Sequence, residues 1–278
     1  MTTQLFQFRE SKLCINDGIA EFSHQVPASR NALSLDLRQE YVQMLDRVQA
    51  DRSIRVLIIT GSGGSFCAGG DLKSMNQRRH SPDPQVRSCD AVRRRLQAVH
   101  VWMERLRNLE IPVIAAVDGP AYGAGFAIAL AADFVLASTR ATFCMSFAKV
   151  GLIPDAGSLY SLPRAVGLSM AKELMYTARR VGVEEARRLG IVHAVHAPEE
   201  LASQAHRFAR RFLQAPREAL GMAKGLLNKS YETPYATLAE LECYAQGTAT
   251  TLPYHDEAVD AFLRAEPSLY DWDRPASA

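Results

Sequence analysis

The sequence predicts an α/β fold built from βαβ units. Two short, continuously apolar and β-branched runs, residues 56–60 and 113–117, are typical of buried strands, and residues 134–137 form a third. Amphipathic helical segments precede and separate the first two runs, and a glycine-rich turn follows each of them. Strands that alternate with helices in this way indicate a parallel sheet over the first two-thirds of the chain.

The early elements can be placed from local signals. Residues 13–22 are expected to form a hairpin, because their Asp-Gly pair tolerates the positive φ of a tight turn. Ser34 is placed as the N-cap of a helix that ends near Ala50, and a second amphipathic helix covers residues 90–109. The polar segment 75–89 contains two prolines and is expected to be a mobile loop, a candidate lid.

The later elements are mostly helical. Residues 126–132 indicate a short buried helix, and helices dominate from residue 165 onward apart from a strand-like run at 191–195. We therefore divide the chain into a core, residues 1–204, and a C-terminal helical region, residues 205–278.

Composition excludes several classes of protein. With 278 residues, 47% hydrophobic and 22% charged, the chain is neither disordered nor fibrous. A net charge of +2 gives no electrostatic reason to expect nucleic acid or an anionic membrane as a partner. Five cysteines without a CxxC pair favour reduced thiols over disulfides or zinc. The N-terminus lacks signal-peptide features and the most apolar stretch is broken by Pro, Gly and Asp, so we expect a cytoplasmic protein.

Two glycine-rich turns, residues 61–71 and 119–125, are the first candidates for chemistry. Each places backbone N–H groups near the start of a following helix, where such groups stabilise negative charge. If the two turns converge, two N–H groups can hold one oxyanion. Neither turn has a dinucleotide or Walker-type phosphate-binding pattern. The alternative is that these glycines only permit tight turns.

The sequence resembles the crotonase (enoyl-CoA hydratase/isomerase) superfamily between about residues 10 and 265. Four segments carry the resemblance in the expected order: RNALS at 30–34, SFCAGGDL at 65–72, IPVIAAVDGPAYGAGFAIALAADF at 111–134 and GLIPDAGSLYSLPRAVG at 151–167. The resemblance implies a spiral of ββα turns with a C-terminal helical oligomerisation region, and a homotrimer or hexamer. It also implies an acyl-CoA thioester as substrate, without a further cofactor or metal, and an oxyanion hole that holds the thioester oxygen.

The resemblance assigns roles to individual positions. The oxyanion donors would be the N–H groups of Gly70 and Ala124, the latter at a position where the family usually has glycine. Contacts to the CoA moiety would come from several residues, of which the last would reach the site from a neighbouring subunit: Arg30, Ala32, Ala68, Asp71, Leu72 and Phe262.

The sequence departs from the hydratases of that superfamily at their two glutamate positions. Ala127 and Phe147 stand there, and neither side chain can hold water or transfer a proton. Asp155 remains as a candidate acid/base, since its apolar surroundings should raise its pKa. The position matches the single acid/base of the isomerases of the phenylacetate-pathway type, which favours double-bond isomerisation of an enoyl-CoA. From the residues alone, a turn or N-cap aspartate is the alternative.

Other functions remain open. Asp155 also matches the nucleophile of 4-chlorobenzoyl-CoA dehalogenase, and His100 matches its general base, although only Phe147 of that enzyme's aromatic cage positions is aromatic here. A lone histidine on an apolar helix face is more often a core residue. A hydratase of different acyl specificity, or a non-catalytic member that binds acyl-CoA or RNA, is a further alternative. We expect the arginines at 78–79 and 93–95 to lie on solvated faces, or at most to contact the phosphates of CoA.

Overall fold

The N-terminal hairpin forms where the sequence predicts it. Asp17 and Gly18 adopt φ angles of 47° and 79°, and they connect β2 (Ser11–Asn16) to β3 (Ile19–His24). The computed structural model describes residues 3–273. In it, β1 (Gln4–Gln7) extends the hairpin on one side and β4 (Val56–Gly61) continues the sheet in parallel on the other.

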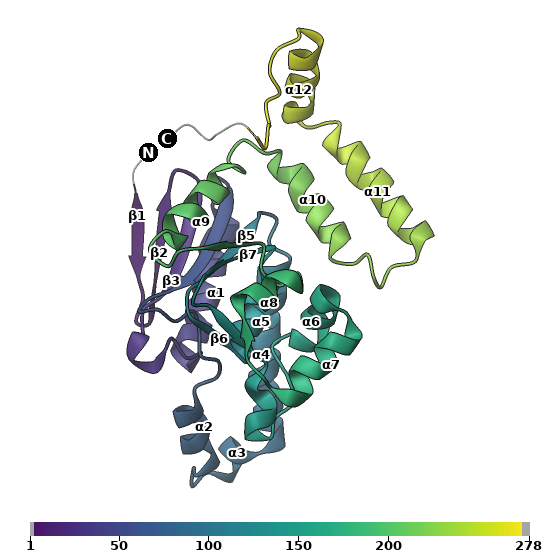
Figure 1. Ribbon diagram of the computed structural model, residues 1–278. Coiled ribbons are helices and arrows are strands. Elements are labelled where there is room, and N and C mark those ends of the chain that lie inside the picture. Colours follow the sequence, from purple (N-terminus) through teal and green to yellow (C-terminus); the bar gives the residue numbers. More distant parts are fainter. Residues whose placement is uncertain (1–2, 274–278) are drawn as a thin grey trace.

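The central sheet has seven strands in the order β1-β2-β3-β4-β5-β7-β10 (Figure 1). Its remaining members are β5 (Val113–Val117), β7 (Phe134–Ser138) and β10 (Ala194–His196), and all pairs from β3 to β10 are parallel. This confirms the α/β class. A second sheet holds β6 (Pro120–Tyr122), β8 (Thr142–Cys144) and β9 (Val181–Gly182). The chain thus adds a short strand to the second sheet after β5 and again after β7, as in a spiral of ββα turns.

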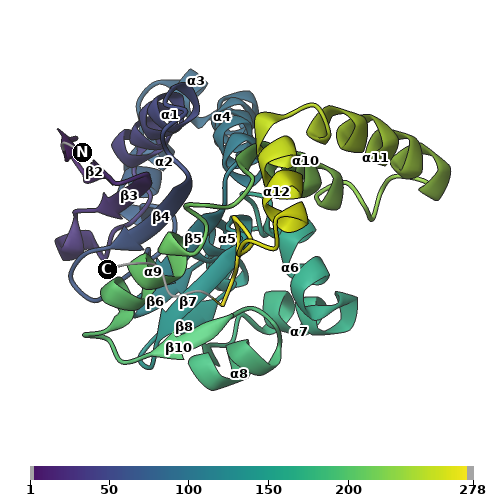
Figure 2. The ribbon, with the colours of Figure 1, turned by 90° about the horizontal axis from the view of Figure 1, so that it is seen from above.

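Helices cover both faces of the large sheet (Figure 2). Ser34 caps α1 (Leu35–Ala50) by accepting a hydrogen bond from the Leu37 amide, as predicted. With α4 (Cys89–Arg107) and α5 (Ala124–Ala131), α1 encloses the larger hydrophobic core. On the opposite face, α9 (Leu201–Arg210) packs against β4 and β5 over a smaller core.

The segment expected to be a mobile loop is helical, so that prediction is wrong. It contains α2 (Leu72–Arg79) and α3 (Pro84–Arg87), which lie at the lower end of the molecule in Figure 1. The carboxylate of Asp71 accepts hydrogen bonds from the amides of the first turn of α2, and that of Asp83 caps α3. Neither helix has a buried residue, which is why the segment looks like a loop in the sequence.

Two smaller expectations also need correction. The turn at 119–125 contains the strand β6, and the strand-like run at 191–195 is shifted to β10. The turn is a strand because Pro120–Tyr122 pairs in parallel with Thr142–Cys144. His193 lies outside β10, where its ring packs edge-on against Phe134 and Phe208 while the residue stays exposed.

The chain then continues through α6 (Ser158–Val166), α7 (Leu168–Thr177) and α8 (Val183–Arg188) before it reaches β10 and α9. After α9, three helices project from the core: α10 (Arg217–Leu227), α11 (Tyr235–Ala249) and α12 (Pro253–Leu263) (Figure 1). We call them the C-terminal arm. The expected boundary at residue 205 falls inside α9, whose side chains pack on the sheet, and the arm begins beyond it. Across residues 3–273 no helix has the length and apolarity to cross a membrane.

Candidate active site

The two glycine-rich turns lie against each other. The amide of Tyr122 donates a 2.9 Å hydrogen bond to the carbonyl of Cys67, and the Cys67 amide donates one of 3.1 Å to the carbonyl of Pro120. A Cβ atom on Gly69 would lie 3.6 Å from the Ala124 nitrogen. The turns that the sequence suggested as an anion-binding pair are therefore neighbours in space.

Backbone geometry leaves the Ala124 amide suited to bind an anion. Ala124 is the first residue of α5, where an N–H has no acceptor in the preceding turn, and Gly123 before it has a φ of 51°. The other loop is fixed directly before Gly70, since Leu33 donates to the carbonyl of Gly69 at 2.7 Å and Ala68 donates to that of Arg30 at 3.0 Å.

Two buried polar residues hold the first glycine-rich loop, and the sequence did not single them out. His24 contacts the carbonyl of Phe66 at 3.0 Å and the Tyr41 hydroxyl at 2.8 Å. Burial lowers the pKa of His24 to about 4. Asn31, with a φ of 55°, donates to the carbonyls of Ser62 and Ser65. A histidine in an apolar strand and the asparagine of RNALS are the signals that could have indicated them.

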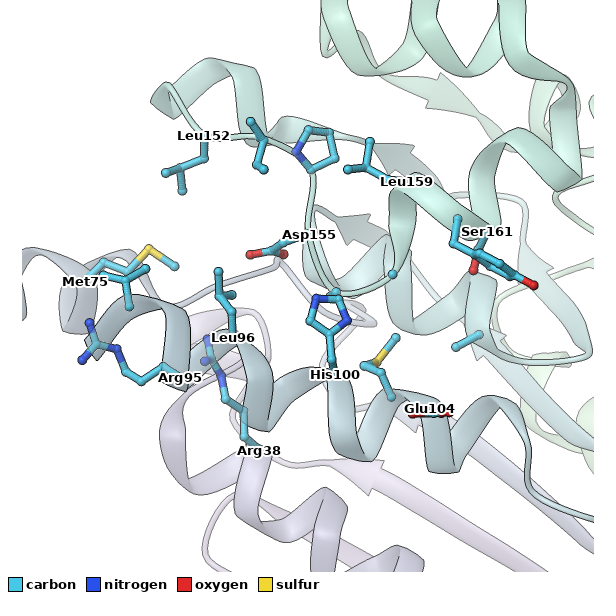
Figure 3. Close-up of a pocket in the computed structure, with 18 of the residues that line it drawn as sticks. Arg38, Met75, Arg95, Leu96, His100, Glu104, Leu152, Asp155, Leu159 and Ser161 are labelled. Carbon is cyan, nitrogen blue, oxygen red and sulfur yellow. The ribbon is translucent and has the colours of Figure 1, made fainter. Parts of the chain in front are cut away.

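A cavity of about 920 Å³ lies beside this loop pair, between α2, α4 and residues 152–161. Asp155 and His100 both line it, and Figure 3 shows the Asp155 carboxylate facing His100 and Leu96 of α4. Gly70 and Ala124 are not among the lining residues. Met75 links the two regions, because it lines the cavity and its Cε lies 2.5 Å from where a Cβ on Gly70 would be.

Within the described part of the chain, the Asp155 carboxylate neither caps a helix nor accepts a hydrogen bond. The residue before α6 that acts as its N-cap is Gly157, and no side chain caps that helix. Asp155 closes the turn through its backbone carbonyl, which accepts from the Ser158 amide at 3.0 Å and the Ser158 hydroxyl at 2.8 Å. Among residues 3–273 no donor bonds to its carboxylate oxygens, so the capping alternative does not apply.

Burial raises the pKa of Asp155, as its apolar sequence context predicts. The neighbouring charges of Arg38 and, to a smaller extent, His100 act in the opposite direction. The balance is a half-buried carboxyl group that holds its proton more tightly than a solvated aspartate, in a cavity large enough for a small organic group.

The arginines at 78–79 and 93–95, which are expected on solvated faces, differ in their surroundings. Arg93 and Arg94 are exposed and form ion pairs with Asp90, as expected of a solvated helix face. Arg78 and Arg95 instead line the cavity because their helix positions face it, and Arg38 of α1 joins them. The expectation of a solvated face is therefore wrong for Arg78 and Arg95, while a contact with the CoA phosphates stays a prediction.

The residues assigned to CoA separate into two groups. Arg30, Ala32 and Ala68 lie together, joined by the hydrogen bond from Ala68 to Arg30, and Asp71 and Leu72 open the adjoining helix α2. Phe262 lies on α12, at the opposite end of the molecule from α2 in Figure 1, and is 81% exposed. One chain therefore does not bring Phe262 to the others.

The positions that differ from the hydratases carry buried apolar side chains. Ala127 lies inside α5 and Phe147 lies in the 3-10 helix at Ser146–Val150. Over the part of the chain that is described, no group of three or more His, Cys, Asp or Glu side chains could hold a metal ion.

The chain is similar to known proteins in both sequence and structure. The model of the enoyl-CoA hydratase/isomerase family matches residues 14–271. The chain belongs to this family. A crystal structure of an enoyl-CoA hydratase/isomerase from Cupriavidus metallidurans CH34 superposes with a TM-score of 0.90 at 36% identity, over 98% of this chain and 99% of that one.

Two family members of known name resemble the chain along most of its length. The 1,2-epoxyphenylacetyl-CoA isomerase of Escherichia coli (strain K12) is 33% identical over 249 residues, covering 90% of this chain and 93% of its own. A 4-chlorobenzoyl coenzyme A dehalogenase of an Arthrobacter species is 30% identical over 252 residues, covering 90% and 89%. The family thus includes relatives with different chemistries.

Proposed function

We propose that the chain isomerises the double bond of an enoyl-CoA thioester, with Asp155 as its single acid/base. The observation that carries the proposal is the half-buried Asp155 carboxylate, which faces the cavity without a hydrogen-bond donor among residues 3–273. The similarity to an epoxyphenylacetyl-CoA isomerase supports an isomerase over a hydratase, as do the apolar residues Ala127 and Phe147.

The reaction needs one proton carrier and one oxyanion site. Asp155 takes the proton at C2 of a 3-enoyl thioester, and the C–H electron pair moves toward the carbonyl to give a dienolate. The N–H groups of Gly70 and Ala124 would stabilise the negative oxygen. The protonated Asp155 then returns the proton at C4, the electrons move back, and the double bond lies between C2 and C3. No water is consumed, and the reaction is redox-neutral overall because C4 gains the hydrogen that C2 loses.

Deuterium labelling tests the reaction type. A panel of CoA thioesters incubated with the protein in D₂O and measured by mass spectrometry should show exchange into an enoyl product without addition of water. Asp155→Asn should lower the rate by about 10²-fold or more, since proton transfer by a positioned side chain typically contributes 10²–10⁴-fold. Glu104→Gln, another carboxylate that lines the cavity, is the matched control. Hydration, or an unchanged rate in Asp155→Asn, contradicts the proposal.

A second candidate is hydrolysis of an aroyl-CoA through an aspartyl ester. The observation in its favour is that His100 lines the same cavity as Asp155, and a dehalogenase is among the relatives. In this reaction the Asp155 carboxylate attacks a halogen-bearing ring carbon and the halide leaves, which gives an aryl ester of Asp155. His100 then activates water, which hydrolyses the ester to a hydroxyaroyl-CoA and the free carboxylate. A covalent adduct on Asp155 would support it, and activity that survives His100→Ala would count against it.

We also propose that the chain works as a homotrimer or hexamer. In support, α11 has no buried residue, and the arm exposes Tyr235, Tyr244 and Phe262. Sedimentation equilibrium should report a mass of three or six chains, and a monomer at micromolar concentration would contradict this.

A further inference from the structure

Three arginines from three helices line the cavity that Asp155 also lines. Arg38 comes from α1, Arg78 from α2 and Arg95 from α4, and all three line the cavity and are partly buried. They are close enough to influence one another. Burial and the charges of Arg78 and Arg95 lower the pKa of Arg38, and burial and Arg95 lower that of Arg78.

These arginines have no carboxylate partner in the described structure. Across residues 3–273 none of them forms an ion pair, whereas their neighbours Arg93 and Arg94 both pair with Asp90. The Nε atom of Arg38 is buried without a hydrogen-bond partner. Arg95 reaches only the carbonyl of Val86, at 3.4 Å. Partly buried charges are normally paired, so three adjacent guanidinium groups without a carboxylate partner fit an anion that comes from outside the chain.

The nearby acidic groups do not balance this charge. The charges of Asp155 and Arg38 shift each other's pKa, but the two side chains form no ion pair. Asp71 also acts on Arg38 and Arg78, but its carboxylate already accepts hydrogen bonds from the first turn of α2. The region around Asp155 therefore keeps a net positive charge.

We propose that the acyl group of the substrate carries a carboxylate and that Arg38, Arg78 and Arg95 bind it. The planar guanidinium fork matches the two oxygens of a carboxylate. The arginines share the cavity with Asp155, and the group that Asp155 acts on is the acyl chain. A charge bound here therefore belongs to that chain. The phosphates of CoA are the other source of anionic oxygens, and the test separates the two. This inference rests on the proposed acyl-CoA function.

Binding of two saturated thioesters provides the test without any turnover. Adipoyl-CoA and hexanoyl-CoA have the same chain length, and only adipoyl ends in a carboxylate. Isothermal titration should show that adipoyl-CoA binds about tenfold tighter or more, since hydrogen bonds to charged groups are among the stronger ones. Arg78→Gln and Arg95→Gln should each reduce this preference by about fivefold or more, and leave hexanoyl-CoA within about threefold of its original affinity.

Arg94→Gln is the matched control, because it removes the same charge from the solvent side of α4. It should leave both affinities unchanged. Circular dichroism confirms that each variant is folded, and the two cavity variants are chosen over Arg38 because Arg38 is the more deeply buried side chain.

Each other outcome has a definite meaning. Equal binding of the two thioesters to the unmodified protein overturns the inference and leaves the proposed function standing. An equal loss of both affinities in Arg78→Gln and Arg95→Gln assigns these arginines to the CoA phosphates and also overturns it. Failure of both thioesters to bind contradicts the acyl-CoA function itself.

Discussion

The amide of Tyr122 donates a 2.9 Å hydrogen bond to the carbonyl oxygen of Cys67, and this contact joins the two glycine-rich turns. Because backbone atoms make the contact, this hydrogen bond does not itself require a particular side chain. This explains how alanine can stand at position 124: a methyl group there leaves the N–H donor in place. The side chains that distinguish one reaction from another, such as Asp155, line the cavity instead.

Adjacent glycines in the first turn should respond differently to alanine. Gly69 has a φ of 94°, and a Cβ there would lie 2.7 Å from the Tyr122 carbonyl oxygen. Gly69→Ala should therefore lower the free energy of unfolding by about 1–3 kcal/mol. Gly70 has no positive φ, and its Cβ would meet only the flexible end of Met75, so Gly70→Ala should change it by less than about 1 kcal/mol. Urea unfolding measures both.

The same Gly70→Ala variant should alter substrate binding, because the displaced Met75 side chain lines the cavity. We expect a higher KM for the thioester with a smaller change in kcat. Combining it with Met75→Ala should restore the KM. If the double variant keeps the defect, Met75 is not the cause.

Asp155→Asn should stabilise the fold while it removes activity. The pKa of Asp155 is raised in the folded protein, so the folded state favours the protonated form and the ionised carboxylate destabilises it above that pKa. An uncharged asparagine avoids this cost. The Tm of the variant at pH 7.5 should exceed that of the unmodified protein, and the difference should shrink as the pH is lowered. A lower Tm at pH 7.5 would show that the carboxylate is a structural group after all.

Arg38 should set the acid limb of the pH profile. A base must be deprotonated to act, so kcat/KM should fall as the pH drops through the pKa of Asp155, above the ordinary range of an aspartate. The positive charge of Arg38 lowers that pKa, so Arg38→Gln should move the limb to higher pH. Arg94→Gln serves as the control and should leave it in place. An unmoved limb in Arg38→Gln would mean that the limb belongs to another group.

His24 should make stability depend on pH below neutrality. Its pKa falls from 6.5 to about 4 on folding because it is buried, so the unfolded chain binds a proton that the folded chain does not. Stability is therefore complete above pH 6.5 and decreases as the pH falls toward 4, by about 3 kcal/mol in total. Urea unfolding at fixed protein concentration measures this. His24→Asn should be less stable at pH 7.5 and show a flatter dependence between these pH values.

Local chemistry explains which elements the sequence predicts well. The hairpin at Asp17-Gly18, the cap at Ser34 and the apolar strands follow from turn geometry, capping and burial, which neighbouring residues decide. The prediction for residues 75–89 is wrong because α2 and α3 have no buried residue. They therefore lack the apolar stripe that would indicate a helix in the sequence. The N-capping aspartates Asp71 and Asp83 are the features of the sequence that indicate the starts of these helices.

The sequence by itself determined the α/β class, the two glycine-rich turns and the candidate Asp155, because each depends on residues that are close along the chain. Only the tertiary structure decided what meets at the cavity. Three interactions join segments that are far apart in the sequence: the hydrogen bond from Tyr122 to Cys67, the hydrogen bond between His24 and the Phe66 carbonyl, and the effect of the Arg38 charge on Asp155. Such pairings depend on how the sheet and helices pack. The direction in which Arg78 and Arg95 face follows from the same packing, and helix periodicity alone does not reveal it.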